Sequence, residues 1–489
     1  MAQGTGWPAS SPDEIERRLA GFRSGDAPTH GGRTFAYVYD SGLADLDDVA
    51  ARAHRAFAPV NCLDPTVFPS VAALENGVVG IAAGLLGGGP QTAGVVTSGG
   101  TESCLLAVLA AREEYRARGG TGTPQIVAAT TSHAAFRKGA HLFGLEVVDV
   151  DVDPANSRVA VADLVAAFTD RTAIVVASAP SYPMGVFDPV AEVAPLAAER
   201  GVWVHVDACI GGWVTPYLQR AGEPIPPCDL SAPGVRSLSV DLHKYGYAPK
   251  GASVLLFVDA ASRRRAYFSS SYWPGYPVVN STLQSTKSAG PLAAAWATLN
   301  LIGDEGYAEL ARKAREATLA LAKGAVAIEG LRLAAPPETT LVAVATDDPA
   351  LDVYVVADEM AARGWYVQPQ PAYRGLPATL HLTVTAASLP RVEPFLADLS
   401  AAVAAAKALP LPEVDPMLLA AAKAIDPDAL TAEQMDAVLG LAGFGTGDGG
   451  PALPERMAPV LTLLQALPPT LRDRMLEEFF SRIFTARTG

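Results

Sequence analysis

Apolar runs alternate with helical segments through the middle of the chain. Short runs rich in valine, isoleucine and alanine occur at residues 93–97, 125–130, 146–152, 172–179, 202–208, 237–241 and 253–258. Most are separated by segments whose apolar residues recur at helical spacing, at 102–119, 133–144, 161–168 and 188–201. Buried strands separated by helices are typical of a doubly wound, mostly parallel α/β sheet. The pattern predicts such a sheet between about residues 61 and 305.

The regions around this sheet have different patterns. Towards the N-terminus, helical spacing predicts helices at 13–23, 46–58 and 71–86. After the sheet, the order helix, strand, strand, helix predicts a smaller α+β domain, and the remaining residues form an Ala/Leu-rich helical region with a glycine-rich loop. We therefore divide the chain into an N-terminal segment (1–60), a large domain (61–305), a small C-terminal domain (306–409) and a helical C-terminal extension (410–489).

The composition is that of a packed globular protein. Of the 489 residues, 49% are hydrophobic and 18% are charged, which excludes a disordered or fibrous chain. The 37 basic and 51 acidic residues give a net charge of −14, which argues against nucleic acid as a partner. Any bound anion must be held by a local group of donors.

The N-terminus, the apolar runs and the cysteines indicate where the protein is located and whether it binds a metal. The N-terminal residues lack the basic start and apolar core of a signal peptide, and no uninterrupted apolar run is long enough for a transmembrane segment. The four cysteines, Cys62, Cys104, Cys209 and Cys228, show neither C-x-x-C nor another metal-ligand spacing, so no metal site is predicted. So few cysteines suit reduced thiols and a cytoplasmic location.

Two motifs lie where predicted strands end. Ser98-Gly99-Gly100-Thr101 joins the first strand to a helix, and glycines with free N–H groups at a helix start can hold a phosphate. Asp207 ends another strand, at the sheet edge where ligands bind. Each motif alone also fits a simpler interpretation: a capped turn for the first, and a backbone-bonded loop aspartate for the second.

Two basic residues follow other predicted strands. Lys244, in the stretch DLHKYG, lies among apolar and aromatic residues. It is a candidate Schiff-base nucleophile because a desolvated amine is partly neutral, although most lysines are surface residues. His133 lies at a strand-to-helix junction, where its ring could stack on a flat cofactor or serve only as a cap.

Together, these four features match the requirements of pyridoxal 5′-phosphate (PLP). Its phosphate needs N–H donors, its pyridine nitrogen needs a carboxylate that keeps the ring protonated, and its aldehyde needs a lysine. The order of the motifs along one array of strands and helices is consistent with a single site.

The chain resembles the group II PLP-dependent decarboxylase family, and within it most closely the sphingosine-1-phosphate lyase branch. The resemblance covers about residues 32–409 and is carried by collinear stretches that include GRTFAYVY, NCLDPTVFPSVAALE, VVTSGGTES, SHAAFRKGAHLFG, HVDACIGGW and SVDLHKYGYAPKGAS. It implies the PLP-dependent transferase fold type I. It also implies a homodimer with the cofactor between the large and small domains, near the subunit interface.

The resemblance further implies cofactor-binding residues by position. Lys244 would bond to the PLP aldehyde and Asp207 would hold the ring nitrogen. His133 would stack on one face of the ring, with Cys209 on the opposite face. Three residues would hold the cofactor phosphate: Gly100, Thr101 and His243.

On the substrate side, the resemblance implies catalytic roles for Tyr39 and Lys250. Thr286 and Lys287 fall where the family reaches towards the neighbouring subunit's site, and Thr286 would contact the cofactor there. Two positions depart from the lyases: Asp64 replaces a histidine that helps to hold the substrate phosphate, and Lys287 replaces an arginine. A carboxylate repels phosphate, and lysine lacks bidentate recognition.

Two activities on a small-molecule amine follow. The first is retro-aldol cleavage of a phosphorylated long-chain amino alcohol, such as sphingosine 1-phosphate, to an aldehyde and phosphoethanolamine; retention of Tyr39 and Lys250 favours it. The alternative is decarboxylation of an L-amino acid, which the wider family and Asp64 favour. A third interpretation is a protein with this fold that no longer binds the cofactor and has no enzymatic activity. Such a protein would have lost Lys244 or Asp207, and both are present.

Overall fold

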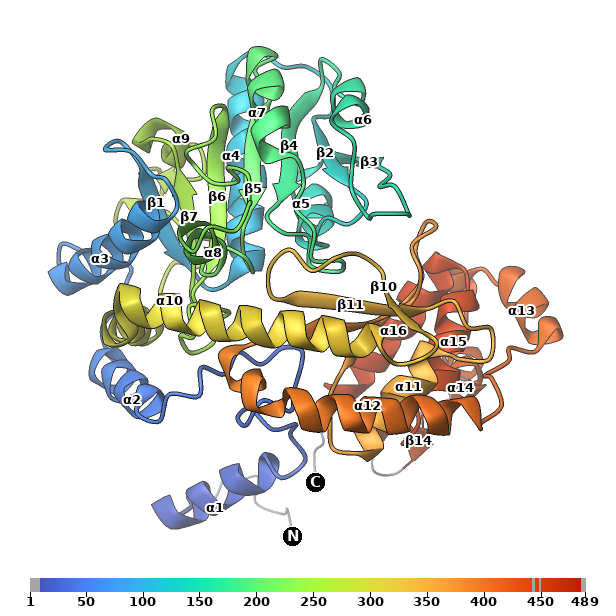
Figure 1. The fold of residues 1–489 in the computed structure, drawn as a ribbon. Helices are drawn as coiled ribbons and strands as arrows, with labels where there is room; N and C mark the ends of the chain where they lie inside the picture. The colour runs from blue at the N-terminus through green and yellow to red at the C-terminus, as the bar shows by residue number, and fades with distance from the viewer. Residues whose placement is uncertain (1–8, 442–444, 448–449, 485–489) are drawn as a thin grey trace, which may run out of the picture.

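In the computed structural model, which describes residues 9–441, 445–447 and 450–484, a seven-stranded sheet forms the centre of the large domain (Figure 1). Its order is β1-β7-β6-β5-β4-β2-β3. All neighbouring pairs are parallel except those of β7, which runs antiparallel to β1 and β6. The predicted mostly parallel sheet is confirmed. The strands are β1 (Ala93–Thr97), β2 (Gln125–Ala129), β3 (Glu146–Val150), β4 (Thr172–Ser178), β5 (Trp203–Asp207), β6 (Val235–Asp241) and β7 (Ser253–Phe257).

Helices cover both faces of this sheet because its strands are apolar on both sides. Successive residues of a strand point to opposite faces. In β4, Ile174 and Val176 therefore pack in one apolar cluster with residues of α4 (Gly100–Ala117) and α5 (Ala135–Phe143). Val175 lies in the cluster on the other face, with residues of α7. The helices of that second cluster include α3 (Pro69–Leu85), α6 (Val161–Ala166), α7 (Val190–Glu199) and α8 (Thr215–Arg220).

A long helix, α10 (Gly290–Val326), connects the large and small domains (Figure 1). It is kinked at Gly303, whose φ of 65° is non-helical and is readily adopted by glycine. The predicted boundary at residues 305 and 306 falls just after this kink.

An antiparallel sheet in the order β10-β11-β13-β12 forms the small domain, as the sequence predicted in outline. Two three-residue strands and one helix were not predicted, because such short strands carry no readable periodicity. The elements are β10 (Leu331–Leu333), β11 (Leu341–Thr346), α11 (Val353–Ala362), β12 (Gln368–Gln370), β13 (Thr379–Thr383), η1 (Ala386–Arg391) and α12 (Val392–Lys407).

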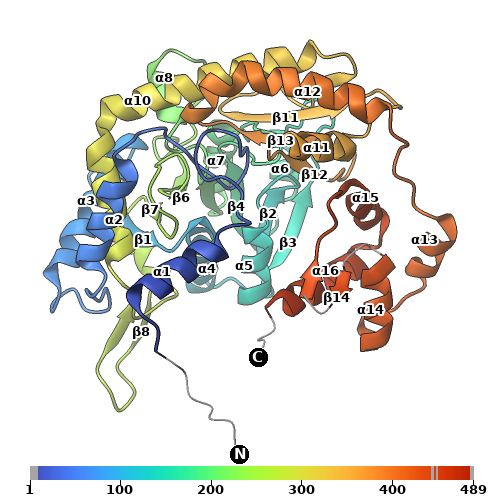
Figure 2. The same ribbon diagram turned by 90° about the horizontal axis from the view of Figure 1, so that it is seen from below.

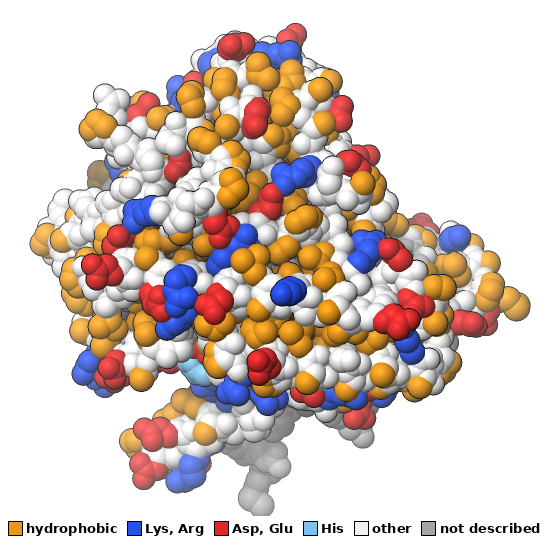
Figure 3. Space-filling model, viewed as in Figure 1, with side chains coloured by type: hydrophobic (Ala, Val, Ile, Leu, Met, Phe, Trp, Pro, Cys, Tyr) orange, Lys and Arg blue, Asp and Glu red, His pale blue; other side chains and the backbone are white. Residues whose placement is uncertain are grey.

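Two segments project from the body of the molecule. Helix α1 (Pro12–Phe22) has no buried residue, and Figure 3 shows it standing apart with charged and apolar side chains exposed. The hairpin of β8 (Phe268–Ser270) and β9 (Val278–Asn280), which follows α9 (Ala260–Arg264), also extends outwards (Figure 2). By contrast, α2 (Leu46–Phe57) packs against α10.

The C-terminal extension has an apolar core of its own, to which Met435, Leu463 and Met475 contribute. It docks on the small domain where Asp358, in α11, accepts hydrogen bonds from the backbone N–H groups of Met457 and Ala458, both 2.9 Å. The predicted glycine-rich loop lies partly outside the described residues. The elements are α13 (Pro416–Lys423), η2 (Pro427–Ala429), α14 (Ala432–Leu441), β14 (Gly445–Gly447), β15 (Gly450–Ala452), α15 (Ala458–Ala466) and α16 (Pro469–Ile483). Among the described helices, none is both long and apolar enough to cross a bilayer.

Replacing Asp358 by alanine tests this docking contact. We expect D358A to destabilise the C-terminal module by about 1 kcal/mol, as loss of an N-cap does, and to make residues near 457 more sensitive to protease. Thermal unfolding and limited proteolysis measure the two effects. The control is D48A, which removes an exposed 3.3 Å ion pair with Arg52 and should cost less than about 1 kcal/mol without changing the cleavage pattern. Unchanged cleavage in D358A would contradict the docking role.

Candidate active site

The carboxyl ends of five strands converge on one cavity of about 330 Å³. Its walls come from the ends of β1, β2, β4, β5 and β6 and from the segments that follow them, so it lies at the sheet edge where α/β proteins bind ligands. The structure brings together seven of the predicted cofactor residues in this lining: Gly100, Thr101, His133, Asp207, Cys209, His243 and Lys244.

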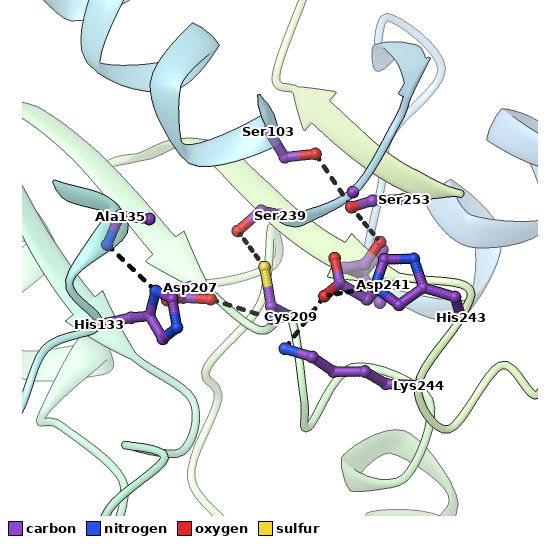
Figure 4. Close-up of polar contacts among 12 residues, drawn as sticks. Ser103, His133, Ala135, Asp207, Cys209, Ser239, Asp241, His243, Lys244 and Ser253 are labelled. Carbon is purple, nitrogen blue, oxygen red and sulfur yellow. Dashed lines mark hydrogen bonds and ion pairs between the residues drawn. The ribbon is translucent and has the colours of Figure 1, made fainter. Parts of the chain in front are cut away.

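Lys244 forms an ion pair inside this cavity. Its Nζ lies 3.0 Å from Oδ2 of Asp241, the last residue of β6, and the two side chains are 21% and 2% exposed (Figure 4). Burial opposes the charge of Lys244, but the carboxylate of Asp241 outweighs it, and the pKa of Lys244 is raised well above 10.5. Burial likewise opposes the charge of Asp241, whose pKa is nevertheless lowered by Lys244 and His243. The free amine is thus held as an ammonium.

Asp207 is a second buried carboxylate, 8% exposed. Its Oδ1 accepts a 3.1 Å hydrogen bond from the backbone N–H of Cys209, which fixes its direction. In the described part of the chain, no basic side chain lies within ion-pair distance of Asp207. A buried carboxylate without a cation is costly, so this position favours a ligand that brings a positive charge.

His133 and His243 line the cavity from two sides. The Nδ1 atom of His133 accepts from the N–H of Ala135 at 3.1 Å, and Nδ1 of His243 accepts from the N–H of Ala252 at 3.3 Å. In their neutral forms, both rings therefore carry the proton on Nε2. Burial lowers the pKa of His243, although Asp241 partly offsets it. Nε2 of His243 lies 3.6 Å from Oδ2 of Asp241, beyond hydrogen-bond distance, so its N–H can still donate to a bound anion.

Gly100, at the start of α4, lies against the Asp241 carboxylate. A Cβ atom at position 100 would lie 2.6 and 2.7 Å from the two carboxylate oxygens of Asp241 and 2.8 Å from Sγ of Cys209. Only glycine fits this close approach. The first N–H groups of a helix have no partner within the helix, so this end of α4 can bind an anion.

Tyr39 and Lys250 lie close to the lysine and histidine of this site. Nζ of Lys250 lies 4.7 Å from the centroid of the Tyr39 ring and donates a 3.1 Å hydrogen bond to the carbonyl of His243. Burial raises the pKa of the Tyr39 hydroxyl, despite an opposing effect of Lys244. Burial and the charge of Lys244 lower the pKa of Lys250 to about 8.

Five residues that the sequence placed on the substrate or interface side are not in the lining of this cavity: Tyr39, Asp64, Lys250, Thr286 and Lys287. Thr286 is exposed, and Nζ of Lys287 donates to the carbonyl of Val96 at 3.2 Å. Asp64 lines a separate hollow of about 840 Å³. Its carboxylate accepts from the N–H and hydroxyl of Thr66, which lowers its pKa.

Asp241 and Tyr182 are among the lining residues that the sequence analysis did not predict. Asp241 stands three residues before Lys244 at the end of a predicted strand, the same signal that identified Asp207. Tyr182 lies in ASAPSYPMG, beyond the carboxyl end of β4. Its hydroxyl donates to Oε1 of Gln368 at 2.6 Å, and burial raises its pKa to about 12. The position after a strand was a readable signal in both cases.

These residues fit PLP. The group carries an anion, a ring nitrogen that can be protonated, and an aldehyde, and the cavity offers a helix start, the unpaired carboxylate of Asp207 and the amine of Lys244. The volume is also within the range of small-molecule sites. The orphan carboxylate is the most specific of these observations, because a protonated pyridine would neutralise it.

Comparison with known proteins identifies the class. Residues 37–346, more than half of the chain, match the pyridoxal-dependent decarboxylase conserved domain. The chain therefore belongs to the pyridoxal-dependent decarboxylase family, and its cofactor is PLP. The fold-type I architecture predicted from the sequence is confirmed by solved relatives.

Within that family, the chain is similar to sphingosine-1-phosphate lyases. The lyase of Dictyostelium discoideum is 37% identical over 347 residues, which are 71% of this chain and 64% of that protein. The solved lyase of Burkholderia pseudomallei is 34% identical with a TM-score of 0.78, over 83% of this chain and 94% of that one. A glutamate decarboxylase of Lactobacillus brevis shares the fold at 22% identity, with a TM-score of 0.73 over 84% and 96%. The chain thus spans just under two thirds of the Dictyostelium protein.

The C-terminal extension also matches a known module. Residues 416–482 match a C-terminal putative helix-turn-helix domain of pyridoxal-dependent enzymes. Sequence reasoning predicted the helices but not this match, because Ala/Leu-rich helices without a chemical motif carry no readable signal of function.

Removing the partner of Lys244 tests the buried ion pair. We expect D241N to lower the free energy of unfolding of the cofactor-free protein by roughly 3 kcal/mol, because it leaves a buried ammonium unpaired. The matched control D241N/K244M, which removes both charges, should recover most of the loss. Denaturant unfolding at pH 7 measures both.

The same pair predicts a pH window. The contribution of Asp241 to the free energy of unfolding is complete above its ordinary pKa of 3.8, and it is lost as the pH falls through the lowered pKa of the folded state. The contribution of Lys244 to the free energy of unfolding is complete below its ordinary pKa of 10.5, and it is lost as the pH rises through the raised pKa of the folded state. The difference between wild type and D241N should be constant between these limits; a double variant no more stable than D241N would contradict the pairing.

Proposed function

We propose that this chain is a PLP-dependent carbon–carbon lyase that cleaves a phosphorylated long-chain amino alcohol, such as sphingosine 1-phosphate, to an aldehyde and phosphoethanolamine. The observation that carries the proposal is that Tyr39 and Lys250 contact each other beside Lys244: Nζ of Lys250 lies 4.7 Å from the centroid of the Tyr39 ring, and both groups lie close enough to Lys244 for its charge to affect their pKa values. The likeness to sphingosine-1-phosphate lyases supports this activity over decarboxylation.

We propose the following roles in holding the cofactor. Lys244 binds its aldehyde carbon, Asp207 accepts the ring N–H, and His133 and Cys209 lie on the two faces of the ring. The phosphate is bound by Gly100, Thr101 and His243, and Thr286 reaches the neighbouring subunit's cofactor. When bound, PLP supplies an electron sink for the bond that breaks at the amine-bearing carbon.

Lys250 and Tyr39 act on the substrate hydroxyl. With a pKa of about 8, Lys250 is partly neutral near neutral pH, and its Nζ can accept the hydroxyl proton as the carbon–carbon bond breaks. Tyr39 keeps its proton because burial raises its pKa, so it orients the substrate oxygen as a hydrogen-bond donor. The positions of these two groups select the bond that is cleaved.

The products decide between the two activities. Purified holoenzyme given sphingosine 1-phosphate should release a long-chain aldehyde and phosphoethanolamine in equal amounts. K244A should lower turnover by at least about a thousandfold while retaining the wild-type circular dichroism spectrum. Aldehyde and carbon dioxide are measured in parallel across phosphorylated long-chain bases and the common L-amino acids. Carbon dioxide without aldehyde would replace the proposal by the decarboxylase alternative.

The proposed base predicts a pH profile. The rate should rise with pH to a plateau, with a midpoint below the ordinary lysine value of 10.5, because burial lowers the pKa of Lys250 and only the neutral amine accepts a proton. K250M and K250R should both lose about 10²- to 10⁴-fold in kcat, since arginine keeps its charge at all relevant pH values. Added ethylamine should partly rescue K250A. Full activity of K250R would contradict the role.

We also propose a cytoplasmic homodimer, with the catalytic unit divided as the sequence predicts into segments 1–60, 61–305, 306–409 and 410–489. All four cysteines are free, which suits a reducing compartment. Ile15, Leu19 and Phe22 of α1 are exposed, as is Tyr272 at the tip of the β8–β9 hairpin. Exposed apolar side chains on projecting elements are typical of interaction surfaces.

A further inference from the structure

The thiols of Cys104 and Cys209 lie beside each other in the wall of the cavity. Cys104 is on α4 and Cys209 follows β5, and they are 1% and 7% exposed. The hydroxyl oxygen of Ser239 lies 3.2 Å from Sγ of Cys209 and 4.0 Å from Sγ of Cys104. Both cysteines are free. The proposed chemistry gives Cys104 no role.

Asp207 adds a carboxylate to this thiol pair. One ligand atom from each of Cys104, Asp207 and Cys209 lies within 4.8 Å of the other two. Figure 4 shows Cys209 and Asp207 next to each other, joined by the hydrogen bond that fixes the carboxylate. In a tetrahedral zinc site with Zn–S bonds of about 2.3 Å, two sulfur ligands lie about 3.8 Å apart. Modest side-chain movement would therefore close these three groups around a metal.

We propose that the cofactor-free protein binds one thiophilic divalent cation, such as Zn²⁺ or Cd²⁺, through Cys104, Asp207 and Cys209. Each sulfur forms a bond to the metal as its S–H bond breaks, so two protons pass to solvent for each cation bound. The fourth position faces the cavity and takes a water molecule. No electron is transferred.

The surroundings support such a site. Oγ of Ser239 also lies 3.2 Å from Nε2 of His205, and Nδ1 of His205 lies 2.8 Å from Oγ of Ser237. All three of these residues are fully buried. Hydrogen bonds of this kind hold metal ligands in place. Two thiolates and one carboxylate around a bound dication leave one net negative charge, the same charge that the carboxylate of Asp207 alone leaves in the empty site.

The metal and the cofactor would exclude each other. This consequence rests on the proposed roles of Asp207 and Cys209 towards PLP, because both groups would be taken up by the cation. The site would therefore be open only before PLP is loaded, and an occupied site would keep the protein inactive.

Titration of the cofactor-free protein with Cd²⁺ tests the site without an activity assay. We expect one Cd²⁺ per chain, a thiolate-to-cadmium absorption band in the ultraviolet, and release of about two protons, measured with a pH indicator. C104S and C104A should each bind Cd²⁺ at least about a hundredfold more weakly, yet take up PLP as the wild type does, which shows that they fold. C62S is the matched control, because Cys62 lies outside the cavity, and it should bind Cd²⁺ normally.

Equal Cd²⁺ affinity in C104S and wild type would overturn the proposal, as would loss of binding in C62S. Loading with PLP should abolish Cd²⁺ binding, and Cd²⁺ should slow PLP uptake at least about tenfold in wild type but not in C104S. Simultaneous binding of both would overturn the exclusion. Cd²⁺ binding is measured without substrate. Failure of the lyase assay would therefore overturn the proposed function without overturning the metal site, and the reverse also holds.

Discussion

The unpaired negative charge in the cavity is the constraint on which the site depends. Two carboxylates, Asp207 and Asp241, are buried with one ammonium, Lys244. Because removing charge from water is costly, the pair of Lys244 and Asp241 can persist, whereas Asp207 needs a cation from outside the chain. A protonated ring nitrogen meets that need, and the resulting electron-poor ring is what the chemistry requires. The negative charge of Asp207 therefore favours a cofactor with a protonated ring nitrogen, and that protonation is what makes the ring able to accept electrons.

The sheet explains why these groups meet although they are far apart in sequence. Parallel strands place their carboxyl ends at one edge, so a residue at the end of β5 and another just after β6 become neighbours. Sequence reasoning predicted this edge, because seven long apolar runs match the seven strands. It also predicted seven of the lining residues, since each of them ends or follows a predicted strand.

Other features could not be predicted from the sequence, for physical reasons. The ion pair of Asp241 with Lys244 depends on side-chain direction within one turn, and no pattern encodes which of two strand-end carboxylates the lysine approaches. The two thiols of Cys104 and Cys209 come together only because α4 packs beside the end of β5, and no sequence spacing encodes that neighbourhood. Short strands such as β10 and β12 carry too few residues for a period.

The C-terminal match at residues 416–482 has five basic and nine acidic residues, so its charge favours protein packing over nucleic-acid binding.

The covalent bond between Lys244 and the cofactor is the central claim, and chemical trapping tests it most directly. Reduction of the PLP-loaded protein with borohydride, followed by proteolysis and mass mapping, locates the lysine that carries the pyridoxyl group. We expect one label per chain, on Lys244, and none in K244A. A label on Lys250 or on another lysine, or undiminished labelling of K244A, would contradict the site described above.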